Sequence, residues 1–192
     1  MRVAYDHGDE EAALWKAELA VSGEFPMTKY AAFVLLMAPV AAFAANNPDA
    51  TFYKHAAEGG LAEVELGNLA QQKSTNQSVK DFGAMMVKDH SAANEKLKSV
   101  AASKNLKLPG SPSVAQMATK TKLKVLSGDT FDKAYVKDMI KDHQEDIAEF
   151  QKEAASGQDA DAKGFAQATL PTLQNHLKRI QSIATDMGIS AD

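Results

Sequence analysis

Hydrophobic residues recur every three or four positions along four long stretches of the chain, the spacing that places them on one face of an α-helix. The stretches cover about 50–74, 76–103, 129–155 and 159–187. Each carries a single apolar stripe, and a helix of that kind must bury its stripe against neighbouring helices. The pattern therefore predicts an all-α protein built as a four-helix bundle.

The breaks between the stretches predict how the helices are connected. Thr75 and Ser156-Gly157 are short breaks, so the first and second pairs of helices should be antiparallel neighbours. The central connection spans some 25 residues and contains a short helix, with Ser113 as its cap and Gly128 as its stop. One long crossover of this kind is typical of ferritin-like bundles. Pro171 lies inside the fourth stretch and should kink it.

The N-terminal part of the chain has a different character. Residues 1–26 carry no motif, and we interpret them as an extension upstream of the true start. Residues 27–44 resemble a secretory signal peptide, with Lys29, an apolar run and an A-x-A cleavage motif at 42–44. The run is shorter than the roughly 20 residues of a membrane span, although a membrane anchor or a buried helix is the alternative reading. The bundle domain is then 45–192, in a periplasmic, secreted or envelope-associated protein.

Composition excludes several classes of function. Hydrophobic residues make up 45% and charged residues 24% of the chain, as in ordinary globular proteins. The formal net charge of -4 offers no basic surface for nucleic acid. With no cysteine, the chain has no disulfide, thiolate metal site, cysteine nucleophile or lipid-bearing cysteine. A serine nucleophile elbow and a phosphate-binding loop are also absent, which argues against a hydrolase and makes enzymatic activity the less favoured reading.

One short motif occurs twice. Residues 86–90 read MVKDH and residues 139–143 read MIKDH, and an aromatic residue precedes each histidine by eight positions. Residues four apart lie on the same face of a helix, so each copy directs a methionine and a histidine the same way. This repeat is the strongest functional signal in the chain.

Four polar residues fall on the apolar stripes, each near the middle of its helix: Glu63, His90, His143 and His176. Helix midpoints stay level whichever way the helices run, so the four side chains are expected to meet in one central layer. Burying such a layer is costly unless a metal ion or a hydrogen-bond network compensates. Three imidazoles and a carboxylate suit a divalent transition metal, namely copper, zinc or iron.

Other residues are secondary candidates. Met86 and Met139 would favour copper(I) as ligands, but they also suit the apolar core. Asp89 and Asp142 are either orienting partners of the imidazoles or surface acids. The Glu-x-x-His motif of dimetal carboxylate bundles is absent, because the residues three before the histidines are valine, isoleucine and leucine. The sequence thus gives no support for a ferroxidase or a di-iron oxygenase.

Four segments together resemble a known family. They are FYKHAAEGGLAEVELGNLAQQ at 52–72, VKDFGAMMVKDHSAANEKL at 79–97, LSGDTFDKAYVKDMIKDHQ at 126–144 and LPTLQNHL at 170–177. They look like the bacterial domain-of-unknown-function family 4142, often labelled a predicted outer membrane protein and grouped with ferritin-like bundles. The resemblance covers roughly 50–187 and implies a ferritin-like fold in a secreted or periplasmic protein. It implies no particular activity.

Two functions are compatible with these observations. The first is a periplasmic metal-binding bundle that serves storage, scavenging or stress defence through the Glu/His layer. The second is a non-catalytic structural or stress-related envelope protein whose polar layer fixes the register of the helices without a metal.

The signal-peptide interpretation makes a direct prediction. Cleavage after Ala44 should remove residues 1–44, so the intact mass of the protein isolated from the periplasm or medium should correspond to a chain that begins at Ala45. A mature N-terminus upstream of Met27 would refute this interpretation.

Overall fold

A computed structural model describes residues 48–190 of the chain, and it is helical throughout this range apart from short connections. Its helices are α1 (Pro48–Lys73), α2 (Gln77–Ser103), α3 (Val114–Lys124), α4 (Gly128–Ser156) and α5 (Ala160–Asp186). No strand occurs between residues 48 and 190, which confirms the all-α prediction. The predicted extension and signal peptide lie outside the described residues.

Local sequence signals account for the start of α3 but not for its end. Ser113 begins α3 as predicted, in a capping box in which the Gln116 backbone N–H donates to the Ser113 hydroxyl. The helix ends at Lys124, however, and Gly128 does not terminate it. Gly128 is instead the first residue of α4, with a φ of 55° that turns the chain into the new helix. Pro171 lies inside α5, which continues past it.

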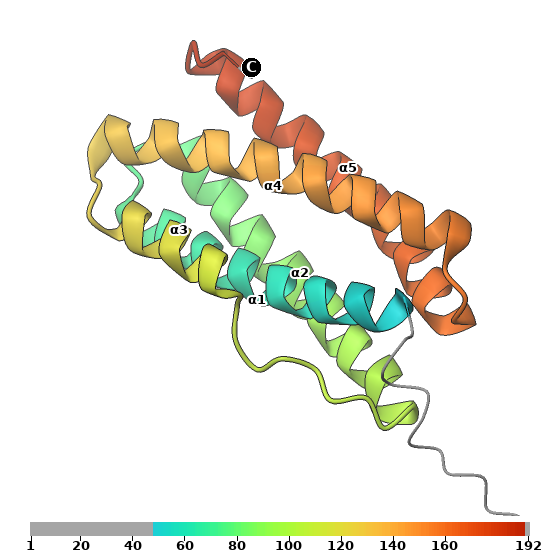
Figure 1. Cartoon of the computed structure of the whole chain (residues 1–192). Coiled ribbons are helices and arrows are strands. Elements are labelled where there is room, and N and C mark those ends of the chain that lie inside the picture. Colours follow the sequence, from blue (N-terminus) through green and yellow to red (C-terminus); the bar gives the residue numbers. More distant parts are fainter. Residues whose placement is uncertain (1–47, 191–192) are drawn as a thin grey trace, which may run out of the picture. The chain divides into compact units, whose positions relative to one another are not determined.

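The four long helices form two hairpins that lie side by side (Figure 1). Helix α1 packs along α2 and α4 along α5, while α1 also borders α4 and α2 borders α5. The Thr75 hydroxyl donates to the Asp132 carboxylate, which joins the end of α1 to the start of α4. At the other end, the Asp49 carboxylate accepts from the backbone N–H of Gln158. Helices α1 and α4 are therefore antiparallel.

This arrangement requires the central connection to run the length of the bundle, as predicted. Residues 104–127 make the crossover, and α3 packs against α1 and α4 on the way. The helical bundle and its long crossover are confirmed, whereas the closer likeness to ferritins stays a prediction from the family resemblance. None of the helices within 48–190 combines the length and the hydropathy needed to cross a membrane.

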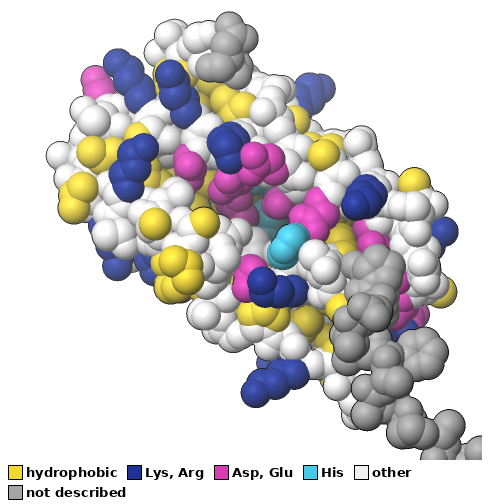
Figure 2. Space-filling model, viewed as in Figure 1, with side chains coloured by type: hydrophobic (Ala, Val, Ile, Leu, Met, Phe, Trp, Pro, Cys, Tyr) yellow, Lys and Arg dark blue, Asp and Glu magenta, His cyan; other side chains and the backbone are white. Residues whose placement is uncertain are grey.

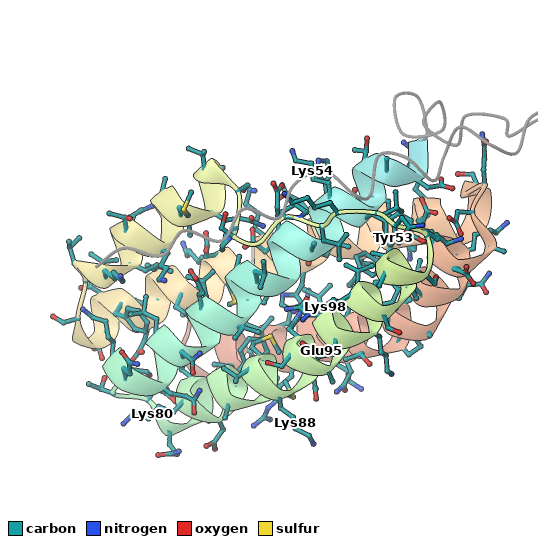
Figure 3. All side chains as sticks on the ribbon, turned by 90° about the horizontal axis from the view of Figure 1, so that it is seen from below. Tyr53, Lys54, Lys80, Lys88, Glu95 and Lys98 are labelled. Atoms are coloured by element: carbon teal, nitrogen blue, oxygen red, sulfur yellow. The ribbon has the colours of Figure 1, made fainter. Side chains whose placement is uncertain are left out.

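Two apolar clusters fill the interior, one toward each end of the bundle. The first gathers around Phe82, Met86, Tyr135 and Met139, and the second around Phe52, Leu97, Phe150 and Leu173. His90, His143 and His176 each lie between the two clusters: along its helix, each histidine has residues of one cluster before it and residues of the other after it. Polar side chains cover the outside, and Lys88, from the first copy of the repeated motif, points away from α2 (Figure 3).

The backbones of α1 and α2 touch at a pair of glycines. A Cβ atom placed on Gly83 would lie 2.6 Å from the Gly67 carbonyl oxygen, and one placed on Gly67 would lie 2.6 Å from the Gly83 carbonyl oxygen. Both distances are too short for a carbon atom. The two helices can approach this closely only because neither residue has a side chain.

We therefore expect Gly83→Ala to destabilise the fold by about 1–3 kcal/mol through overpacking, although alanine is the better helix former. Gly164→Ala is the matched control, because a Cβ atom at this exposed helical position would meet nothing within 4 Å. The control should stabilise the protein by about 0.5–1 kcal/mol. Urea unfolding of the two variants measures both effects, and equal stabilities would contradict the close helix contact.

Candidate metal centre

Three of the four predicted stripe residues converge in the middle of the bundle. His90 from α2, His143 from α4 and His176 from α5 have ring centroids 5.4–5.8 Å apart. One ring nitrogen of each lies within 4.8 Å of the other two. Within residues 48–190, no other set of three or more His, Cys, Asp or Glu side chains brings ligand atoms this close.

Hydrogen bonds fix which nitrogen of two imidazoles carries a proton. His143 Nδ1 lies 2.9 Å from the Met139 carbonyl oxygen, one turn back along α4, and a carbonyl can only accept. His176 Nε2 lies 3.0 Å from the Asp89 carboxylate on α2, which also accepts. The protons therefore sit on His143 Nδ1 and His176 Nε2. In the neutral rings, the remaining nitrogens carry lone pairs.

Those remaining nitrogens face each other. His143 Nε2 and His176 Nδ1 are 3.4 Å apart, a distance at which one of them would need a proton to make a hydrogen bond. His90 adds a third buried ring nitrogen, Nε2, that has no hydrogen-bond partner. A positively charged particle between His143 and His176 would satisfy the two nitrogens that face each other.

A proton is a poor candidate for that particle near neutral pH. Burial, together with the neighbouring His176, lowers the pKa of His143 to about 4. Burial and the two other imidazoles also hold the pKa of His90 well below its usual value. The pKa of His176 is lowered by burial despite its bond to Asp89. All three rings are thus kept neutral, which is the form that binds metals.

Glu63, the fourth predicted residue, lies beside this group. Its side chain is 2% exposed, and Oε1 comes within 3.9 Å of His143 Nδ1, the nitrogen that faces away from His176. Its other oxygen is buried without a partner. Burial raises the pKa of Glu63 well above its usual value, and the nearby aspartates of α4 raise it further. Its predicted role as a ligand stays a prediction.

The secondary candidates separate into different surroundings. Met86 and Met139 are fully buried in the first apolar cluster. Asp89 accepts a hydrogen bond from His176 and so orients this imidazole, which is the first of the two roles predicted for it. Asp142 is partly buried, and burial followed by the Asp138 charge raises its pKa to about 6. The orienting role of Asp142 stays a prediction.

Asp142 belongs to a run of carboxylates along α4 whose other members, Asp138 and Asp146, the sequence analysis does not identify. Asp138, Asp142 and Asp146 are spaced four apart, so they lie on one face of the helix, and each is partly buried. Figure 2 shows acidic side chains gathered around histidines on this face of the molecule. Burial and the charges of Asp142, Glu149 and Glu145 raise the pKa of Asp146 to about 7. The regular spacing of the aspartates was the signal that could have revealed them.

This site has the components of a protein metal centre. Each of the three neutral imidazoles has a ring nitrogen within 4.8 Å of the other two. Asp89 orients one of them, His176, through its far nitrogen, an arrangement common around bound metals. The 3.4 Å separation of His143 Nε2 and His176 Nδ1 equals the ligand spacing of a tetrahedral site with metal–nitrogen bonds of about 2.0–2.1 Å.

The raised pKa of Asp146 predicts a pH-dependent cost in stability. The pKa of this carboxyl is 3.8 when exposed and about 7 in the fold. At low pH the protonated side chain therefore adds to the stability of the fold, and this contribution is lost as the pH rises toward 7. Asp146→Asn should therefore raise the melting temperature of the metal-free protein at pH 8, by about 2–4 °C for each kcal/mol relieved. The gain should shrink toward pH 5, and a gain independent of pH would contradict the assignment. Thermal scans in chelator measure it.

Comparison with solved structures shows that this fold occurs in other proteins. A crystal structure described as that of a secreted protein DUF305 from Streptomyces coelicolor superposes with a TM-score of 0.65 at 13% sequence identity. The match covers 76% of this chain and 97% of that one. At this identity the likeness concerns the fold alone. No curated protein matches the chain by sequence.

A family sequence model matches most of the chain, over residues 36–183, and is described as Domain of unknown function (DUF4142). This range includes all three histidines, Glu63 and the aspartates of α4. The resemblance noted from the sequence segments is thereby confirmed, and the chain belongs to the DUF4142 family.

Proposed function

We propose that this protein is a periplasmic or secreted helical bundle that binds a divalent transition metal ion through His90, His143 and His176. The observation that carries the proposal is the pair of lone-pair nitrogens, His143 Nε2 and His176 Nδ1, which face each other at 3.4 Å. Their other nitrogens are committed to acceptors, so neither ring can donate to the other. A metal ion supplies the positive charge that the arrangement requires.

The donor set favours copper, zinc or iron among the common metals. Imidazole nitrogen suits all three, while magnesium and calcium prefer oxygen. Three protein ligands leave one coordination position free, which can hold water or an exchangeable group. Such a site suits the capture and release of an ion in storage, scavenging or stress defence.

A structural role without metal is the second candidate, and one observation favours it. Two of the three imidazoles already make a hydrogen bond within the protein, to Met139 and to Asp89. The polar layer can then fix which helices pair and at what height. This alternative leaves His90 Nε2 and Glu63 Oε2 without partners, and both atoms are buried.

The location outside the cytoplasm rests on two supports. The sequence contains a predicted signal peptide at 27–44, and the structural neighbour from Streptomyces coelicolor is described as secreted. The absence of cysteine is compatible with an oxidising compartment.

Metal binding should stabilise the fold measurably. At a metal concentration 100 times the dissociation constant, the gain is about 2.7 kcal/mol, or roughly 5–10 °C in melting temperature for a chain of this size. We expect Zn²⁺ or Cu²⁺ to raise the melting temperature of the untagged mature protein, and chelator to reverse the rise. His143→Ala should abolish both the shift and the bound metal found by elemental analysis.

His55→Ala is the matched control, because His55 is an exposed histidine that pairs with Glu149 at 2.9 Å and takes no part in the cluster. This variant should keep the full metal-dependent shift. If His143→Ala lowers stability while neither protein responds to metal or chelator, the structural role is correct and the metal proposal fails.

A further inference from the structure

The three histidines differ in how close they lie to the surface. His143 and His176 are 0% exposed, whereas His90 retains 6% exposure. Of the three rings, only His90 retains contact with solvent.

A small cavity borders His90 one helical turn from the histidine layer. Its volume is about 20 Å³, and its lining includes Gly59, Gly60, Asn94 and Asp146. A cavity of this size has room for about one water molecule, provided that polar groups line it. His90 and Asp146 both do, so a particle of that size could contact a histidine of the cluster and a carboxylate at once.

Asp146 connects this cavity to the acidic face of α4. It is partly buried, and its Oδ1 lies 3.8 Å from the position that a Cβ atom would take on Gly59 of α1. Asp142 and Asp138 follow it at intervals of four residues along the border with α1. All three carboxylates act electrostatically on Glu63 of α1, so they lie along the boundary between α4 and α1, called the groove from here on. Figure 2 shows acidic side chains gathered on one face of the molecule.

The groove also contains buried oxygens that lack partners. Glu63 of α1 is 2% exposed, and its Oε2 has no hydrogen-bond partner. The Tyr135 hydroxyl and Asp138 Oδ2 of α4 are buried and unpartnered as well. Unsatisfied buried oxygens are costly, and a passing cation with its water would satisfy them.

We propose that the groove between α1 and α4 is the passage by which a divalent cation reaches the histidines, with Asp146 as the last carboxylate before His90. This inference rests on the proposed metal-binding function. Negative charge in a groove raises the local concentration of cations and speeds their association. The carboxylates do not form a closed cage of their own, since the three histidines are the only described group with ligand atoms within 4.8 Å. They deliver the ion and the histidines hold it.

Gly59 keeps this passage open. Gly59 lines the cavity beside His90. A Cβ atom there would lie 3.7 Å from Gln116 Nε2 of α3 and 3.8 Å from Asp146 Oδ1, both ordinary contact distances. Gly59→Ala should therefore narrow the cavity without a clash. At the adjacent Gly60, a Cβ atom would lie 1.9 Å from the Asn94 side chain, so Gly60→Ala would disturb the packing and is the poorer probe.

Stopped-flow measurement of Co²⁺ binding, followed by its visible absorption in the untagged mature protein, tests the passage. Asp146→Asn should lower the association rate constant about 3–10-fold and weaken its dependence on salt, because the local negative potential is reduced. The dissociation rate constant should change by less than about twofold, since association carries the steering effect. Gly59→Ala should slow association and dissociation by the same factor and leave the dissociation constant unchanged, as expected of a narrowed route.

Asp81→Asn is the control, because it makes the same change of carboxylate to amide at an exposed position on α2. It should leave both rate constants unchanged. If wild-type protein binds Co²⁺ and all three variants associate at the wild-type rate, the passage is wrong and the metal site stands. If wild-type protein shows no Co²⁺ absorption, the metal site and the passage fail together. Melting curves of each variant confirm that the fold is intact.

Discussion

The centre of the bundle is governed by an electrostatic mismatch between two histidines. His143 Nε2 and His176 Nδ1 point at each other, and the hydrogen bonds at their opposite nitrogens leave both as acceptors. Apolar clusters on either side keep this pair away from bulk water. Burial also lowers the pKa of both rings, so protonating one of them to relieve the mismatch costs free energy. This mismatch is the physical basis of the proposed metal-binding function.

The position of Glu63 and His90 along the bundle axis depends on a backbone contact between α1 and α2. Gly67 lies one turn after Glu63 on α1, and Gly83 lies two turns before His90 on α2. Because the backbones of these glycines touch, α1 and α2 cannot slide along each other without a steric clash. The contact therefore fixes the position of His90 relative to Glu63. Two residues without side chains thus set the register of a polar site one and two turns away.

Much of this arrangement follows from periodicity. The apolar stripes assign Glu63 and the three histidines to the interior, and their central positions in the helices predict a common level. Periodicity cannot say which ring nitrogen faces which neighbour, because that depends on side-chain rotamers and on contacts between helices far apart in sequence. The bond from His176 to Asp89, 87 residues away, is of this kind. The position of Glu63 at the outer nitrogen of His143 is another.

The acidic run on α4 shows how the stability of the empty protein and the capture of an ion oppose each other. Asp142 and Asp146 are partly buried near one another, and their raised pKa values of about 6 and 7 report the cost of ionising them in the folded state. A structural bundle would be more stable with neutral side chains at these positions. A cation nearby changes the balance, because its charge favours the ionised carboxylates and they in turn favour its approach. Under the proposed function, the same residues that weaken the metal-free fold therefore strengthen the attraction of the groove for a metal ion.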